Sequence, residues 1–109
     1  MIAPVAQHYD GPSAIRQKIR ALAQRSQTQA RDIWDLDHLF RLVASTVVIP
    51  PAVSALLPIA IERAIDLGYG TYEAQVISYL ASEDQELYGD KEAWDQMQER
   101  VVTHLVALQ

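Results

Sequence analysis

The sequence predicts a mainly α-helical domain, a bundle of about five helices preceded by one N-terminal strand. Three observations predict this fold class. Apolar residues recur at spacings of three and four along most of the chain after residue 13. Capping residues and prolines divide this pattern into separate segments. The length of 109 residues and the hydrophobic content of 50% fit one domain with one core and exclude a disordered chain.

The first ten residues form the segment that is most typical of a β-strand. Residues 2–9 are predicted to be extended, and a proline near their start restricts them to the edge of a sheet. A second β-branched run, residues 46–49, is short and ends at two prolines. A lone strand leaves its backbone groups unpaired. We therefore expect residues 1–10 to complete a sheet outside this chain and residues 11–109 to form the helical domain.

A first helix is predicted over residues 14–25, with Ser13 as its N-cap. Lys18 and Arg25 are seven residues apart and lie along one edge of its apolar face. That face consists of Ile15, Ile19 and Leu22.

A second helix is predicted over residues 30–44. On a helical wheel, Asp32 lies inside its apolar arc, whereas Asp35 lies on the far side, near Arg31 and His38. A carboxylate that faces the core costs free energy unless it pairs with a cation or takes part in the function. Asp32 is therefore the candidate site residue. The apolar arc consists of Ile33, Leu36, Leu39, Phe40 and Val43.

Shorter helical segments are predicted in the middle of the chain. A third helix should run from residue 50 to Leu67, and Pro58 should either kink it or divide it into two. Gly68 is its expected C-cap, and Thr71 can cap a fourth helix. Residues 82–85 have the spacing of a capping box for a further short turn.

The last helix is predicted over residues 91–108, with Asp90 as its N-cap. Its apolar residues follow spacings of three and four, so one face should close the bundle. These residues are Trp94, Met97, Val101, Leu105 and Leu108.

Composition narrows the classes of function. The net charge of −5 argues against a general nucleic-acid binder, although residues 11–41 hold six of the nine basic side chains. The absence of cysteine excludes a disulfide framework and a thiol nucleophile. No apolar run approaches the roughly 20 residues that span a bilayer, and no signal peptide is visible. We therefore expect a cytoplasmic protein without a membrane partner.

Common catalytic motifs are missing from the sequence. The three histidines fall in different predicted elements, so histidine ligation of a metal is not expected. No phosphate-binding glycine loop or nucleophile elbow is present. Asp35 and Asp37 point about 160° apart on a helix, which does not suit a shared ion.

One constellation remains around the turn between the first two helices. A helical hairpin would bring Arg25 and Asp32 together, with Lys18 two turns back and Arg31 beside the turn. A lysine beside an apolar face can contact a nucleotide phosphate, and the carboxylate could orient it or bind a ribose hydroxyl. The alternative is a structural salt bridge between Asp32 and a basic residue, which spacing alone favours.

Two sequence blocks carry a resemblance. They are Lys18-Ile19-x-Ala21-Leu22-x-x-Arg25 and Ala30-Arg31-Asp32-x-x-Asp35-Leu36, with Trp94, Met97 and Val101 in the last predicted helix. Together they resemble the C-terminal half of the AbiEii family of nucleotidyltransferases, from about residue 5 to the end. These enzymes are toxins of type IV toxin–antitoxin and abortive-infection systems.

The resemblance implies the helical half of a polymerase-β-like transferase. It implies Lys18 and Asp32 as catalytic residues, with Asp35 as the alternative carboxylate. Lys18, Arg25 and Arg31 are the expected nucleotide-binding residues. The implied reaction transfers a nucleotide from an NTP to an RNA acceptor, such as a tRNA 3′ end.

The chain departs from the family because it lacks the glycine-serine block and the DxD motif of the N-terminal strands. Phosphoryl transfer needs carboxylate-held magnesium, so Mg²⁺ and NTP are expected for the complete enzyme and no metal for this chain. We expect the chain to be inactive alone and to need an N-terminal nucleotidyltransferase half. An antitoxin protein and tRNA are further expected partners. The alternative function is a non-catalytic helical protein-interaction module derived from the same fold.

Overall fold

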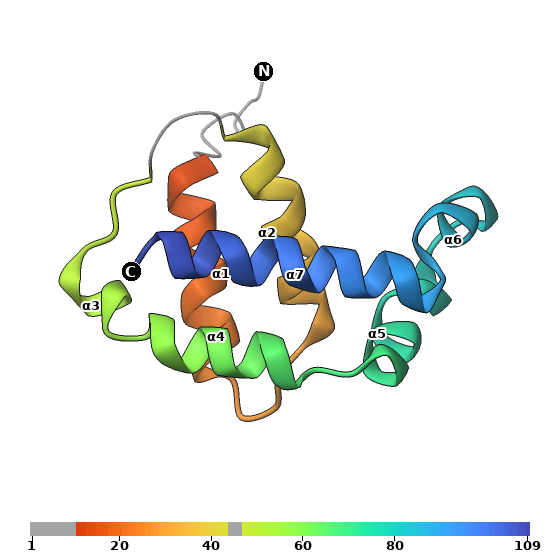
Figure 1. Ribbon diagram of the computed structural model, residues 1–109, viewed down its shortest axis with the longest axis horizontal. Coiled ribbons are helices and arrows are strands. Elements are labelled where there is room, and N and C mark those ends of the chain that lie inside the picture. The colour runs from red at the N-terminus through yellow and green to blue at the C-terminus, as the bar shows by residue number, and fades with distance from the viewer. Residues whose placement is uncertain (1–10, 44–46) are drawn as a thin grey trace, which may run out of the picture.

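The computed structural model describes residues 11–43 and 47–109, and all regular structure within them is helical (Figure 1). This confirms the mainly α-helical prediction, while the expected strand at 2–9 lies outside the described residues. The elements are α1 (Gly11–Gln24), α2 (Ala30–Leu42), α3 (Pro51–Ser54), α4 (Leu57–Asp66), α5 (Tyr69–Gln75), the 3₁₀ turn η2 (Ile77–Tyr79), α6 (Ser82–Tyr88) and α7 (Lys91–Ala107).

The bundle is built on the hairpin of α1 and α2. Helix α7 crosses this hairpin and α4 runs beside α7, while α3 and the α5–α6 region lie at opposite ends (Figure 1). The main contacts join α1 to α2 and α4, and α7 to α2 and α4. The core therefore lies between four helices. Its large, fully buried side chains include Ile15, Ile19, Leu22, Ile33, Leu36, Leu57, Trp94, Met97, Val101 and Leu105.

Helix α1 begins at Gly11, three residues before the predicted start. The prediction of Ser13 as N-cap is therefore wrong, because a proline in the first turn is compatible with a helix and does not delay it. A Cβ on Gly11 would lie 2.6 Å from Cγ2 of Val43, just after the end of α2. A larger residue at this position would therefore force the Val43 side chain to shift.

Pro58 divides the predicted third helix into α3 and α4 and lies in the first turn of α4. Thr71 does not cap the next helix, because α5 begins at Tyr69 after Gly68. Asp90 caps α7 as predicted, since its carboxylate accepts a hydrogen bond from the Ala93 backbone N at 2.7 Å. The proline and the last cap act locally, which explains why sequence could locate them.

Two side chains from distant segments fix the turn between α1 and α2. Nη1 of Arg63 on α4 donates to the carbonyl oxygens of Leu22 (3.1 Å) and Arg25 (2.6 Å), which are free at the end of α1. Oε1 of Gln75 on α5 accepts from the Ala30 backbone N at 2.7 Å. The turn that carries Arg25 is therefore held from both sides.

A third such contact joins α7 to α4. Nε2 of Gln98 lies 2.7 Å from the carbonyl oxygen of Ala64, 3.1 Å from that of Ile65 and 2.9 Å from that of Leu67. One amide thus satisfies the backbone at the end of α4, where intrahelical partners are missing.

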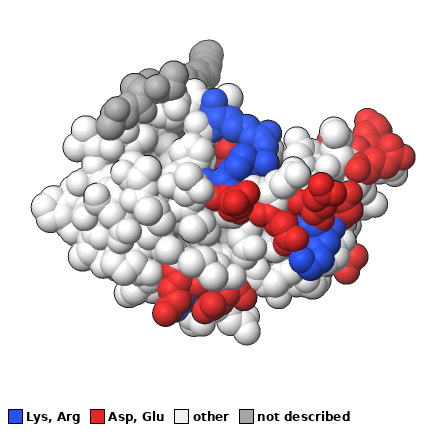
Figure 2. Space-filling model, in the orientation of Figure 1, with Lys and Arg blue, Asp and Glu red and all other residues white. Residues whose placement is uncertain are grey.

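Charge is unevenly distributed over the surface. Asp and Glu side chains gather over α6, whereas the side of the molecule at α3 shows almost no charge (Figure 2). The latter agrees with the absence of any charged residue between positions 43 and 61. Among the described residues, no helix combines the length and apolar character needed to cross a membrane.

Candidate functional site

Asp32 is a buried carboxylate in the first turn of α2, with an exposed fraction of 1%. Arg25 holds both of its oxygens, with 2.7 Å from Nε to Oδ2 and 3.2 Å from Nη2 to Oδ1. Such a paired contact of guanidinium with carboxylate is strong and fixes the orientation of both groups. The predicted approach of Arg25 and Asp32 across the hairpin is confirmed.

Lys18 on α1 lies between two carboxylates of α2. Its Nζ is 2.8 Å from Oδ2 of Asp35 and 3.5 Å from Oδ1 of Asp32. The prediction that Asp35 faces away from this cluster is therefore wrong. Residues three apart on a helix share a side, and the long lysine side chain reaches both.

Exposure separates the two carboxylates. Asp35 is 30% exposed and Lys18 is 28% exposed, whereas Asp32 is almost fully buried. The prediction that Asp32 is the more buried of the two is confirmed. Lys18 and Asp35 line an open groove, and Asp32 lies behind Lys18 without lining it. The other lining residues are Ala14, Gln17, His38, Leu39 and Leu42.

The electrostatics of the cluster favour its charged form. Partial burial lowers the pKa of Lys18, but the hydrogen bonds and negative charges of Asp35 and Asp32 outweigh this effect and raise it above its ordinary value. The hydrogen bond to Asp32, followed by its charge, raises the pKa of Arg25. Both cations are consequently protonated throughout the neutral range.

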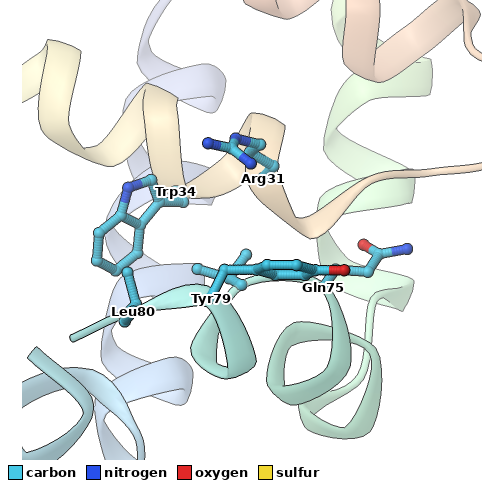
Figure 3. Close-up of a pocket in the computed structure, with 6 residues that line it drawn as sticks. Arg31, Trp34, Gln75, Tyr79 and Leu80 are labelled. Atoms are coloured by element: carbon cyan, nitrogen blue, oxygen red, sulfur yellow. The ribbon is translucent and has the colours of Figure 1, made fainter. Parts of the chain in front are cut away.

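Arg31 does not join this cluster. It lines a different cleft, together with Trp34, Gln75, Val76, Tyr79 and Leu80 (Figure 3). Of the residues predicted for one site, the structure therefore brings together Lys18, Arg25, Asp32 and Asp35 and leaves Arg31 apart.

A second buried carboxylate, Asp37, was missed by the sequence reasoning. It is 2% exposed, and its Oδ1 and Oδ2 lie 2.9 and 3.0 Å from Nε and Nη2 of Arg100 on α7. Arg41 adds a contact of 3.1 Å from Nη2 to Oδ2. The i,i+4 spacing of Asp37 and Arg41 was a local signal for part of this cluster. Arg100, 63 positions away, had none.

The described residues do not form a metal centre. No group of three or more potential metal-ligating side chains occurs in 11–43 and 47–109. Nδ1 of His38 contacts the Trp34 carbonyl oxygen at 2.8 Å, and the ring of His104 stacks on Phe40. Asp32 and Asp35 are both paired with cations.

Comparisons of the chain with protein-family models, with curated proteins and with solved structures each found no match. The resemblance to AbiEii nucleotidyltransferases therefore stays a prediction that rests on the two sequence blocks.

Proposed function

We propose that this chain is the helical half of an AbiEii-like nucleotidyltransferase, which transfers a nucleotide from an NTP to an RNA acceptor, with tRNA as the expected acceptor. In this proposal the enzyme is a cytoplasmic toxin of a type IV toxin–antitoxin system. The observation that carries the proposal is the position of Lys18, which lies at a groove, is protonated and is held by a buried carboxylate.

Lys18 is the residue that meets the nucleotide in this proposal. Its partner Asp35 is partly exposed and can turn to solvent, which frees Nζ for a phosphate oxygen. Asp32 cannot follow, because it is buried and fixed by Arg25. It therefore keeps the ammonium group at the groove while the partner of Nζ changes from carboxylate to phosphate.

This geometry changes the roles that the resemblance implies for the two carboxylates. Asp32 is a positioning residue that acts through Lys18 and Arg25, since it does not line the groove. Asp35 is the carboxylate that a ligand in the groove can contact. The described residues offer no carboxylate set for Mg²⁺, so the metal belongs to the part of the enzyme that carries the DxD motif.

The test combines this chain with a fragment that carries the glycine-serine and DxD blocks. Incorporation of labelled nucleotide into total tRNA is measured with magnesium. We expect no incorporation by the chain alone, activity with the fragment, and a loss of at least ~100-fold for Lys18→Ala. Lys91→Ala is the matched control, because Lys91 forms an exposed 2.9 Å pair with Asp95 on α7. Equal activity of both lysine variants would contradict the proposal.

The second candidate function is a non-catalytic interaction module. One observation favours it: Lys18, Arg25, Asp32 and Asp35 already form ion pairs with one another, as a purely structural cluster would. In that case Lys18→Ala would lower the stability of the chain without changing the activity of any reconstituted enzyme. Unfolding and transfer measurements on the same variant separate the two functions.

A further inference from the structure

The cleft between α2 and the α5–η2 segment has a cation, two aromatic rings and an amide in its walls. Tyr79 is 78% exposed, so its ring is accessible to a ligand. Figure 3 shows the Arg31 guanidinium facing the Tyr79 ring across the cleft, with Trp34 and Leu80 at one side. The cleft itself has room for only about 70 Å³ of solvent, so a ring system bound there would lie partly outside it, against Tyr79 and Arg31.

One polar group of the cleft, the Arg31 guanidinium, is available to a ligand. Arg31 forms no ion pair or hydrogen bond with any other residue of the part that the structure describes. The amide of Gln75 is engaged with the Ala30 backbone N and lies beyond the hydroxyl end of Tyr79, with its nitrogen pointing away from Arg31 (Figure 3). A planar ligand on Tyr79 could thus meet the guanidinium on its other face.

Hydrogen bonds hold the segments that line the cleft in place, so the cleft is formed before a ligand binds. The contact between Gln75 and Ala30 ties α5 to the first turn of α2. Nε2 of Gln85 on α6 donates to the carbonyl oxygens of Ile77 and Leu80, both at 3.0 Å, and fixes the turn that carries Tyr79. Ordering of the walls therefore adds little to the cost of binding.

The cleft and the Lys18 groove share a ridge on α2. Trp34 lines the cleft and His38 lines the groove, and their ring centroids are 4.4 Å apart. An extended chain with a base in the cleft can therefore pass over this ridge toward Lys18.

We propose that this cleft, the base slot, holds one unpaired nucleobase of the RNA acceptor, stacked between Tyr79 and Arg31. The inference rests on the proposed function for the identity of the RNA. Its chemistry is that of single-strand recognition, in which aromatic rings and arginine planes stack on exposed bases without reading a duplex. Arg31 also offers its charge to a neighbouring phosphate.

The test is tryptophan fluorescence of the full chain, titrated with a short single-stranded oligoribonucleotide, with AMP and with ribose 5-phosphate. Trp34 borders the slot, whereas Trp94 is 1% exposed, so quenching by a stacked base reports Trp34. We expect quenching by the oligoribonucleotide and by AMP, none by ribose 5-phosphate, and weaker binding of the same sequence as a duplex.

Variants assign the binding to the slot. Tyr79→Ser and Arg31→Gln should each weaken oligoribonucleotide binding by ~10-fold or more. Both residues are exposed, so the variants should fold, and Leu87→Ser on α6 is the matched control because Leu87 is 68% exposed and does not line the slot. Unchanged affinity in the slot variants, equal response to ribose 5-phosphate, or no binding up to ~10 mM AMP would overturn the inference.

The two proposals fail in different ways. If Tyr79→Ser loses oligoribonucleotide binding but Lys18→Ala retains full transfer activity, the base slot stands and the proposed function fails. If Lys18→Ala abolishes transfer while Tyr79→Ser neither weakens binding nor raises the KM for the RNA acceptor, the proposed function stands and the base slot fails.

Discussion

Asp32 and Asp37 are two buried carboxylates on the same helix that differ in where their partners come from. Each is at most 2% exposed, and each is held by Nε and a terminal nitrogen of one arginine. The arginine of Asp32 is seven residues away across one turn, whereas that of Asp37 is 63 residues away on α7. The first pair therefore closes a hairpin, and the second joins α2 to the last helix, α7.

The surroundings of the two carboxylates also differ. Beside the buried Asp32, Lys18 lines the groove and has a second, partly exposed partner in Asp35. Among residues 11–43 and 47–109, the second cluster has no comparable exchangeable acid, since Arg41 and Arg100 both bind Asp37 itself. Burial of the carboxylate does not distinguish the two clusters, and neither does exposure of the cations, since Arg41 (48%) and Arg100 (38%) are more exposed than Lys18 (28%). In our proposal the distinguishing feature is the second, partly exposed carboxylate that Lys18 contacts.

The largest expected effect on stability is at the Asp37 cluster. Arg100→Ala leaves a buried carboxylate with only the half-exposed Arg41, so we expect a loss of about 2–3 kcal/mol in the free energy of unfolding. Urea denaturation followed by circular dichroism measures it. Arg41→Ala serves as the control and should cost less than about 1 kcal/mol. If Arg100→Ala and Arg41→Ala lowered the free energy of unfolding equally, the contact between Asp37 and Arg100 would not be what holds α7.

A smaller loss of stability is expected for Asp32→Asn, about 1–2 kcal/mol, because Lys18 and Arg25 can both turn to solvent. In the reconstituted enzyme its effect on transfer should exceed that of Asp37→Asn, since Asp32 positions Lys18. Activity measured per folded molecule checks this. If Asp37→Asn lowers transfer more, the assignment of the two clusters would be reversed.

Both regions should lose stability at alkaline pH. Burial, followed by nearby Tyr88, Tyr69 and Asp37, raises the pKa of Tyr72 above its ordinary value of 10.0. The folded chain holds this proton more tightly than the unfolded chain, so stability falls as pH rises above 10. The raised pKa of Lys18 acts in the same direction above 10.5. The midpoint of thermal unfolding between pH 8 and 11 measures the loss.

Tyr72→Phe separates the two contributions to this pH dependence. The variant loses the 3.0 Å hydrogen bond to the Tyr88 carbonyl oxygen and is less stable at neutral pH. Its further loss between pH 10 and 11 should be smaller than that of the original chain. An identical slope in both proteins would exclude Tyr72 as a contributor.

The smallest expected effect is at the exposed pair of Lys91 and Asp95. Their side chains are 70% and 51% exposed, so Lys91→Ala should change the free energy of unfolding by less than about 0.5 kcal/mol. The same urea titration provides the value. A cost similar to that of Arg100→Ala would show that burial does not set the ranking of the ion pairs.

Helical spacing predicted the inward position of Asp32, its approach to Arg25 and most of the core, because these features depend on local geometry. Asp35 was wrongly placed on the far side of the helix, although residues three apart share a side and Lys18 reaches both carboxylates. The contact of Asp37 with Arg100 could not be predicted, because it depends on where α7 crosses α2.

The sequence also did not predict the helix ends that are capped by side chains from distant segments. Arg63 at the end of α1 and Gln75 at the start of α2 have no signal in the segments they cap. Asp90 did have such a signal, because it caps its own helix three residues on. The base slot escaped prediction for a related reason, since Arg31 and Tyr79 come from segments that only the folded bundle brings together.

The contact of Gln98 with α4 has a consequence for the order of folding. Three carbonyl oxygens at the end of α4 find their side-chain partner on α7, more than 30 residues later in the chain. While the polypeptide is being synthesised, α4 therefore emerges before the group that completes it. The hairpin of α1 and α2 closes over a short loop and can form early. We therefore expect docking of α7 to be the late step, at which the end of α4, the Asp37 contact and the core become native together.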